Sequence, residues 1–388
     1  RRPGGGGMTM LLDLGPDLLV KVLCRLGLRE LLALSSTCRE MRSLILERDD
    51  LWATKVEQRV GKKLGRLCHW NSLQSYALLY QFLAKYAGLE GLWAGDIQPR
   101  GQLLRIEYED GGLVGRRYLV DYHPHRAQQD VTASHLFKLE PTEQDGKLYV
   151  RCLWYTGDRD EQTEPGLQRA ESSCTSADSI PADSALSVSG DIFRLTRPEF
   201  DDEPQEHLVE DTLLRFRQYV LRGRIPPESK PRCVEYRRIR TPKAVQPEDS
   251  AEVQEPPCVR EGLYWALYGY HGPEIIEVCY EGDFIVGRKV TGDPNVPCGK
   301  VSFSVRRKGR APSEVPPRIL NVLSNLLDAP NREIKVIYDG TGRVASVSYR
   351  NPETIPAKML QYQDGNFALL LSPYGLVLDF QPFTLPTV

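Results

Sequence analysis

The chain has 388 residues, of which 41% are hydrophobic and 26% charged, the balance of a folded domain rather than of a disordered chain. Its formal net charge of -2 argues against a general nucleic-acid partner, because phosphate binding needs a basic excess. The longest apolar runs fall short of the roughly 20 residues that span a bilayer, so no membrane partner is predicted. The nine cysteines lie far apart with no C-x-x-C pair, which predicts free thiols and a cytoplasmic and nuclear location.

The first ninety residues have helical periodicity. Between Pro16 and Gly27, apolar residues recur at positions 18, 19, 22, 23 and 26, which form one face of a helix. Further helices are predicted at 31–34, 37–46, from 51 behind the acidic pair at 49–50, and at 73–86. We expect residues 1–10 to be a disordered leader, 11–56 to form a helical lobe, and 57–90 to be a helical linker.

The sequence after residue 90 is typical of short antiparallel strands. Runs rich in β-branched and aromatic residues alternate with turn sequences such as Glu281-Gly282-Asp283 and Asp339-Gly340. The predicted strands cover 103–108, 113–122, 147–155, 233–241, 262–270, 274–280, 284–291, 332–338 and 344–349. We therefore predict an α+β fold in which the helical lobe precedes a mainly antiparallel β-barrel-like domain over 91–388. Two helical excursions, at 205–221 and 317–327, and loops near 159–184, 242–257 and 306–317 are expected to interrupt it.

The helical start resembles an F-box, the short adaptor that inserts into Skp1 of cullin-RING ubiquitin ligases. A bundle of about 40 residues cannot bury so many leucines by itself, which favours a face completed by a partner. The alternative is an ordinary helical lobe packed on the β domain. The residues that this resemblance assigns to Skp1 binding are Leu14, Pro16, Leu18, Leu19, Val22, Leu23, Leu31, Leu34, Leu51 and Trp52.

A longer resemblance, to the F-box only protein 31 family, runs in order over most of residues 11–383. Its clearest segments are Gly91-Leu-Trp-Ala-Gly-Asp-Ile97, Tyr236-Arg-Arg-Ile239, Tyr268-Gly-Tyr-His-Gly-Pro-Glu-Ile275 and Thr291-Gly-Asp-Pro-Asn-Val-Pro297. The resemblance implies a non-catalytic substrate receptor of an SCF ubiquitin ligase, with Skp1 as direct partner and the cullin and RING subunits bound through Skp1. It also implies protein substrates held by their C-terminal tails, including D-type cyclins or C-terminally amidated proteins.

Turn-forming residues at 291–295 predict a small concavity for such a tail. Thr291, Gly292, Asp293 and Asn295 would offer backbone amides, a hydroxyl group and a carboxylate, and Asp293 would accept from an amide while repelling a free acid. Three aromatic residues and two arginines complete the predicted substrate site: Trp93, Arg237, Arg238, Tyr264 and Tyr268. The alternative is a tight turn that only joins two strands.

No cofactor or catalytic site is predicted. Cys152 and Cys174 occupy positions where the family has zinc-ligand cysteines, but no histidine follows either of them closely, so we predict no metal. The chain contains no P-loop, dinucleotide-binding, zinc-protease or nucleophile-elbow motif. Two alternative hypotheses of a different kind of function remain. One is a closed β-barrel that binds a small apolar ligand and is not a ligase subunit. The other is an enzyme whose active site carries no recognisable sequence motif.

Overall fold

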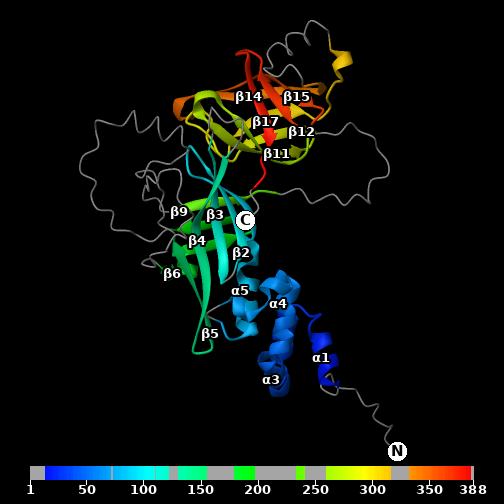
Figure 1. Ribbon diagram of the computed structural model, residues 1–388, viewed down its shortest axis with the longest axis vertical. Helices are drawn as coiled ribbons and strands as arrows, with labels where there is room; N and C mark the ends of the chain where they lie inside the picture. Colours follow the sequence, from blue (N-terminus) through cyan, green and yellow to red (C-terminus); the bar gives the residue numbers. More distant parts are fainter. Residues whose placement is uncertain are drawn as a thin grey trace, which may run out of the picture. The chain divides into compact units, whose positions relative to one another are not determined.

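The computed structural model describes residues 14–70, 73–109, 111–121, 130–154, 179–196, 233–240, 259–315 and 332–385 (Figure 1). The chain divides into two compact units, one of residues up to 90 with 107–114 and 136–184, the other of 91–106, 115–135 and 185 onward. The expected leader, the loop at 242–257 and both helical excursions lie outside the described residues. None of the described helices is long and apolar enough to cross a membrane.

Five helices form the N-terminal part, drawn in blue in Figure 1: α1 (Pro16–Leu23), α2 (Leu28–Ser35), α3 (Arg39–Glu47), α4 (Asp49–Leu64) and α5 (Tyr76–Tyr86). Gly27, predicted to end the first helix, instead precedes α2, and the Glu30 carboxylate accepts its backbone N–H. The thiol of Cys38 accepts from the N–H of Met41 at the start of α3. The helical segments are therefore where the apolar periodicity predicts them, with different ends.

A small apolar core holds these helices together. Leu19 and Leu23 of α1, Leu31 of α2 and Leu51 of α4 are buried. The indole N–H of Trp52, which is also buried, donates to the carbonyl oxygen of Ile45 at 2.7 Å. The core thus uses one side of α1 and leaves the other to solvent.

Nine strands form the first sheet: β1 (Gly91–Gly95), β2 (Gln102–Glu109), β3 (Gly112–Asp121), β4 (Asp130–Gln144), β5 (Lys147–Trp154), β6 (Ser179–Pro181), β7 (Leu186–Ser189), β8 (Ile192–Thr196) and β9 (Cys233–Arg238). Their order is β6-β5-β4-β3-β2-β1-β9-β8-β7. The end of the loop predicted at 159–184 is wrong, because 179–181 pair with β5 and the short helix α6 (Ala182–Ala185) follows.

Eight further strands close into an antiparallel barrel, coloured yellow to red in Figure 1: β10 (Gly262–Leu267), β11 (Pro273–Glu281), β12 (Phe284–Lys289), β13 (Val301–Arg306), β14 (Ile334–Ser346), β15 (Arg350–Tyr362), β16 (Phe367–Leu371) and β17 (Leu376–Pro382). Strand β17 pairs with β10, so no edge of this sheet is left open. Alternate residues such as Ile276, Val278, Phe303 and Phe367 fill the interior. The predicted α+β fold with a β-barrel is confirmed.

The turn predicted at Asp339-Gly340 is wrong. Strand β14 runs straight through both residues, and Gly340 pairs with Val305 of β13 and Ala357 of β15. A Cβ atom on Gly340 would lie 2.3 Å from the carbonyl oxygen of Ser304. The glycine therefore permits the close approach of a neighbouring strand rather than a reversal of the chain.

Candidate functional site

One end of the barrel interior holds a cavity of about 160 Å³ with two chemically different walls. The apolar wall consists of Val344, Ala345, Leu369, Leu371, Leu376 and Leu378. The polar wall consists of Tyr268, His271, Lys289, Asp293, Asn295, Ser302 and Arg343, with Val296 beside them. Such a cavity fits one apolar side chain and one polar group joined to it.

Lys289 is the centre of the polar wall. It ends β12, and the alternation of that strand puts Ile285 and Lys289 on the interior side. Its ammonium nitrogen lies 2.5 Å from Oδ2 of Asp293 and 2.6 Å from Oε2 of Glu274, and all three side chains are at most 3% exposed. The same nitrogen lies 4.2 Å from the ring centroid of Tyr268.

The two carboxyl groups of this cluster have opposite pKa shifts. Burial raises the pKa of Glu274 well above its ordinary value, and the charge of Asp293 raises it further although Lys289 opposes the shift. Burial also acts to raise the pKa of Asp293, but Lys289 and the hydrogen bonds to Asp293 outweigh it and lower the pKa to about 2. The cluster thus combines one carboxyl group with a lowered pKa and one with a raised pKa.

Asp293 also organises the turn that was predicted as the tail site. Its Oδ1 atom accepts from the backbone N–H groups of Asn295 at 2.6 Å and Val296 at 2.8 Å. Thr291 Oγ1 accepts from the N–H of Ile275 at 2.7 Å, and Gly292 lies where a Cβ atom would be 2.4 Å from the N of Cys298. Three donors reach the two oxygens of Asp293, and a carboxylate can accept about four hydrogen bonds, so its role as acceptor for a substrate amide stays a prediction.

The other predicted substrate residues fall in three places. Tyr268 lines the barrel cavity with Asp293 and Asn295. Tyr264 is buried in the barrel core, edge-on to Phe367. The remaining three lie on β1 and β9, outside the barrel interior: Trp93, Arg237 and Arg238.

Sequence reasoning missed four polar residues of the cavity: His271, Lys289, Ser302 and Arg343. Lys289 lies within the strand predicted at 284–291. It is four residues after Ile285, and this even spacing was the signal that could have placed it on the same face of the strand as Ile285. Glu274, directly behind Lys289, was equally unexpected because charged residues are almost never fully buried unless paired.

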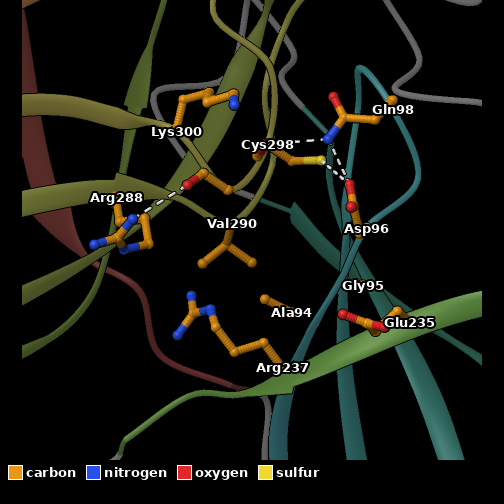
Figure 2. Close-up of a pocket in the computed structure, with 11 residues that line it drawn as sticks. Ala94, Gly95, Asp96, Gln98, Glu235, Arg237, Arg288, Val290, Cys298 and Lys300 are labelled. Carbon is orange, nitrogen blue, oxygen red and sulfur yellow. Dashed lines mark hydrogen bonds between the residues drawn. The ribbon is translucent and has the colours of Figure 1, made fainter. Parts of the chain in front are cut away.

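A second cavity, of about 320 Å³, lies among β1, β9 and the outer side of β12 (Figure 2). Arg237 and Arg288 line it, and they pair with Glu277 at 2.8 Å and Glu281 at 3.1 Å. The Cys298 thiol donates to Asp96 at 3.6 Å, and burial together with Asp96 raises the pKa of this thiol to about 12. Three cationic side chains, of Arg237, Arg288 and Lys300, and two carboxylates, of Asp96 and Glu235, line this cavity, and Ala94 and Val290 are its apolar side chains.

The helical unit exposes several large apolar side chains. Leu18 is 57% exposed, and Val22, Leu32 and Leu46 are also exposed. Other residues predicted to bind Skp1 face the helical core instead: Leu19, Leu23, Leu31, Leu51 and Trp52. Leu14 and Leu34 are half-buried, and Pro16 is the first residue of α1.

Cys152 lies in β5 with its side chain fully buried, and burial raises the pKa of its thiol to about 12. A thiol of that pKa is a poor metal ligand, because metals bind the thiolate. Cys174 lies outside the described residues. Among those that are described, no group of three or more His, Cys, Asp or Glu side chains could hold a metal ion.

Comparison with known proteins gives separate matches to the N-terminal helices and to the barrel. A family model described as F-box domain matches residues 11–52, and one described as Cyclin D1 binding domain matches residues 236–383. The chain is 25% identical to F-box only protein 31 of Rattus norvegicus over 399 residues, covering 100% of this chain and 74% of that protein. It is 26% identical to the proteins of that name from Mus musculus and Homo sapiens, covering 84% and 82% of this chain but 62% and 56% of theirs. These matches confirm the resemblance predicted from the sequence.

Proposed function

We propose that this chain, an F-box protein homologous to F-box only protein 31, is the substrate-recognition subunit of an SCF ubiquitin ligase. In this proposal the helical unit binds Skp1, and the barrel cavity binds the C-terminal tail of a protein substrate. The cavity with its separate apolar and charged walls is the observation that carries the proposal.

The exposed leucines support the Skp1 half of the proposal. Leu18 and Val22 lie one helical turn apart on α1, and Leu32 on α2 and Leu46 on α3 are also exposed. Exposed apolar groups of this size gathered in one small helical unit are typical of a surface that a partner covers. The cullin and RING subunits would then be bound through Skp1.

The cavity supports the tail half of the proposal. In an unmodified polypeptide, only a terminus can place one side chain and a polar end group in the same cavity. Leu369 and Leu371 would contact that side chain, while Lys289 and Asn295 would lie near the end group. D-type cyclins and C-terminally amidated proteins are the substrate classes that the resemblance implies.

The chain itself would perform no chemistry. Its contribution is to hold the substrate near a charged conjugating enzyme, which raises the effective concentration of the reacting groups. The alternative, a barrel for a small apolar ligand, has less support because side chains fill the interior and the remaining 160 Å³ is small for such ligands.

The test has two arms. The full chain is co-expressed with Skp1 for co-purification, and it is separately presented with a library of C-terminal peptides. Ala345→Trp, which fills the cavity, should lose tail binding but keep Skp1, whereas Ala311→Trp on an exposed residue away from the cavity should change neither. Wild-type tail affinity in Ala345→Trp would exclude this cavity, and failure to capture Skp1 would exclude the adaptor role.

A further inference from the structure

The cavity of about 320 Å³ beside β1, β9 and β12, here called the polar cleft, takes no part in the proposed tail site. All of its lining residues belong to the same compact unit of the chain. It is larger than the barrel cavity and stands at the lower end of the size range of ligand pockets. A volume of this size fits a few side chains of a ligand.

The polar cleft separates its charges onto two sides. In Figure 2 the cationic groups of Arg237, Arg288 and Lys300 lie on the left, and the carboxylates of Asp96 and Glu235 lie on the right. The apolar side chains of the cleft lie between them. A ligand that carries both an anionic and a cationic group therefore meets the opposite charge on each side, whereas a simple anion such as phosphate would also meet the two carboxylates.

The two arginines are oriented by groups outside the cleft. Arg237 donates to Glu277 at 2.8 Å and Arg288 donates to Glu281 at 3.1 Å, and neither glutamate lines the cleft. Arg288 also donates to the carbonyl oxygen of Gly299 at 3.3 Å. Since a guanidinium group has five N–H donors, these contacts leave donors for a ligand. The orientation is set before a ligand binds, which lowers the entropy cost of binding.

The carboxylates on the opposite side are oriented in the same way. Oδ1 of Asp96 accepts from the Cys298 thiol at 3.6 Å and from the side-chain amide of Gln98. Oε2 of Glu235 accepts from Arg194 at 3.0 Å. No described residue donates to Oδ2 of Asp96 or to Oε1 of Glu235, so each carboxylate keeps one oxygen for a ligand.

A single turn borders both cavities. Asn295 and Val296 line the barrel cavity, whereas Cys298, Gly299 and Lys300 line the polar cleft. Two residues of extended chain span at most about 7 Å, so Val296 and Cys298 place the two cavities close together. A protein that is bound by its tail in one cavity therefore has other segments within reach of the second.

We propose that the polar cleft binds an internal segment of a substrate protein, one that carries an acidic and a basic side chain within a few residues of each other. The acidic side chain pairs with Arg237, Arg288 and Lys300, and the basic side chain lies against Asp96 and Glu235. The inference rests on the proposed role as a substrate receptor, but it does not depend on the tail cavity. A substrate held at both cavities binds more tightly than at either one, because the second contact is intramolecular.

The experiment uses head-to-tail cyclic peptides, which have no terminus and therefore cannot occupy the tail cavity in the proposed way. Each peptide has six residues, of which one is Asp, one is Arg and the others are Gly and Ala, and the set covers every spacing of the two charges. Calorimetry measures their binding to the full chain at low ionic strength, where charge pairing is least screened. At least one spacing should bind, and changing its Asp to Asn or its Arg to citrulline should each weaken binding about tenfold.

Three variants of the chain place the peptide. Lys300→Glu replaces attraction by repulsion at an exposed position of the cleft and should weaken the cyclic peptide about tenfold. Lys308→Glu is the matched control, because Lys308 is also exposed but lies beyond the other end of β13, and it should bind as wild type does. Ala345→Trp, which fills the barrel cavity, should keep the cyclic peptide and lose the tail peptide.

Four results would each overturn the inference. No cyclic peptide binds wild type, Lys300→Glu binds as wild type does, Lys308→Glu weakens binding as much as Lys300→Glu, or Ala345→Trp loses the cyclic peptide. Unchanged binding after the Arg-to-citrulline change would also overturn it, because the cleft would then be a site for an anion alone. If the cyclic peptide bound as expected and tail peptides did not bind wild type, the tail site would fail and the polar cleft would stand.

Discussion

The guanidinium group of Arg238 lies 4.1 Å from the ring centroid of Trp93, its register partner across β1 and β9. Trp93 is fully buried, and its ring is edge-on to Phe193 at 4.7 Å. Phe193 in turn stacks on Tyr236 at a centroid distance of 4.7 Å. Trp93 and Arg238, both predicted for the tail site, thus belong to an aromatic stack that stabilises the sheet.

Arg238→Ala should lower the free energy of unfolding by about 1–2 kcal/mol, because it removes a cation–π contact and the packing of the arginine stem. Urea denaturation measures this change. Tail affinity should be unaffected in the folded fraction. An unchanged stability with lost peptide binding would instead put Arg238 in the substrate site.

The two adjacent leucines of α1 should give opposite phenotypes. Leu18→Asp adds a charge to an exposed position, so it should leave the free energy of unfolding within about 0.5 kcal/mol and abolish Skp1 capture. Leu19→Asp adds a charge to a side chain that is 3% exposed, and it should destabilise the helical unit by several kcal/mol.

Circular dichroism and co-purification separate these two effects. Arg25→Asp, at an exposed position just after α1, controls for the introduction of an acidic residue. A Leu18→Asp protein that captures Skp1 as well as wild type would contradict the assignment of the exposed face.

Asp293 should stabilise the barrel in a pH-dependent way. Its pKa is lowered from 3.8 to about 2, so its stabilisation is complete above pH 4 and is lost as pH falls toward 2. The shift corresponds to about 2 kcal/mol. Asp293→Asn should therefore be less stable than wild type at pH 6 and should lose less of its stability on acidification, as measured by urea denaturation between pH 2 and 6. Parallel curves for the two proteins would show that the ion pair with Lys289 contributes nothing.

Gly340→Ala tests the reinterpreted turn. A Cβ atom at this position would lie 2.3 Å from the Ser304 carbonyl oxygen and 2.5 Å from the Cα of Val305, and backbone atoms cannot move aside without disturbing β13. We expect a loss of about 3 kcal/mol in the free energy of unfolding. Gly88→Ala, where a Cβ atom would meet nothing within 4 Å, should change stability by less than about 0.5 kcal/mol. A tolerated Gly340→Ala would mean that β13 and β14 are further apart than described.

Local patterns predicted four of the eight barrel strands, namely β10, β11, β12 and β14, and none of β13, β15, β16 and β17. In β16 every residue from Phe367 to Leu371 is buried, so that strand has no alternation to recognise. Local patterns failed at Gly340, which allows a neighbouring strand to pack closely. A glycine in this role has the same sequence signature as a glycine in a turn. Local patterns also missed β4 (Asp130–Gln144), where Phe137 and Leu139 are buried on one face but most of the other residues are polar.

The site was harder to predict for a physical reason. Asp293 and Asn295 stand in a recognisable turn sequence, whereas Lys289 and Glu274 are charged residues inside strands, where periodicity assigns no role to charge. Their pairing depends on the register of β11 against β12, which places Ile276 opposite Lys289. Register is a long-range property that a single sequence does not display.

The apolar contacts outside the barrel determine which truncated fragments of this protein can be expressed without exposing apolar surface. Ile239, Ile275, Val290 and Phe383 pack with Leu103 and Tyr118, which belong to β2 and β3. A recombinant fragment that starts at Tyr236, where the Cyclin D1 binding domain match begins, would leave this apolar surface bare and should aggregate. Fragments intended for crystallisation or peptide screening should therefore retain the chain from residue 91.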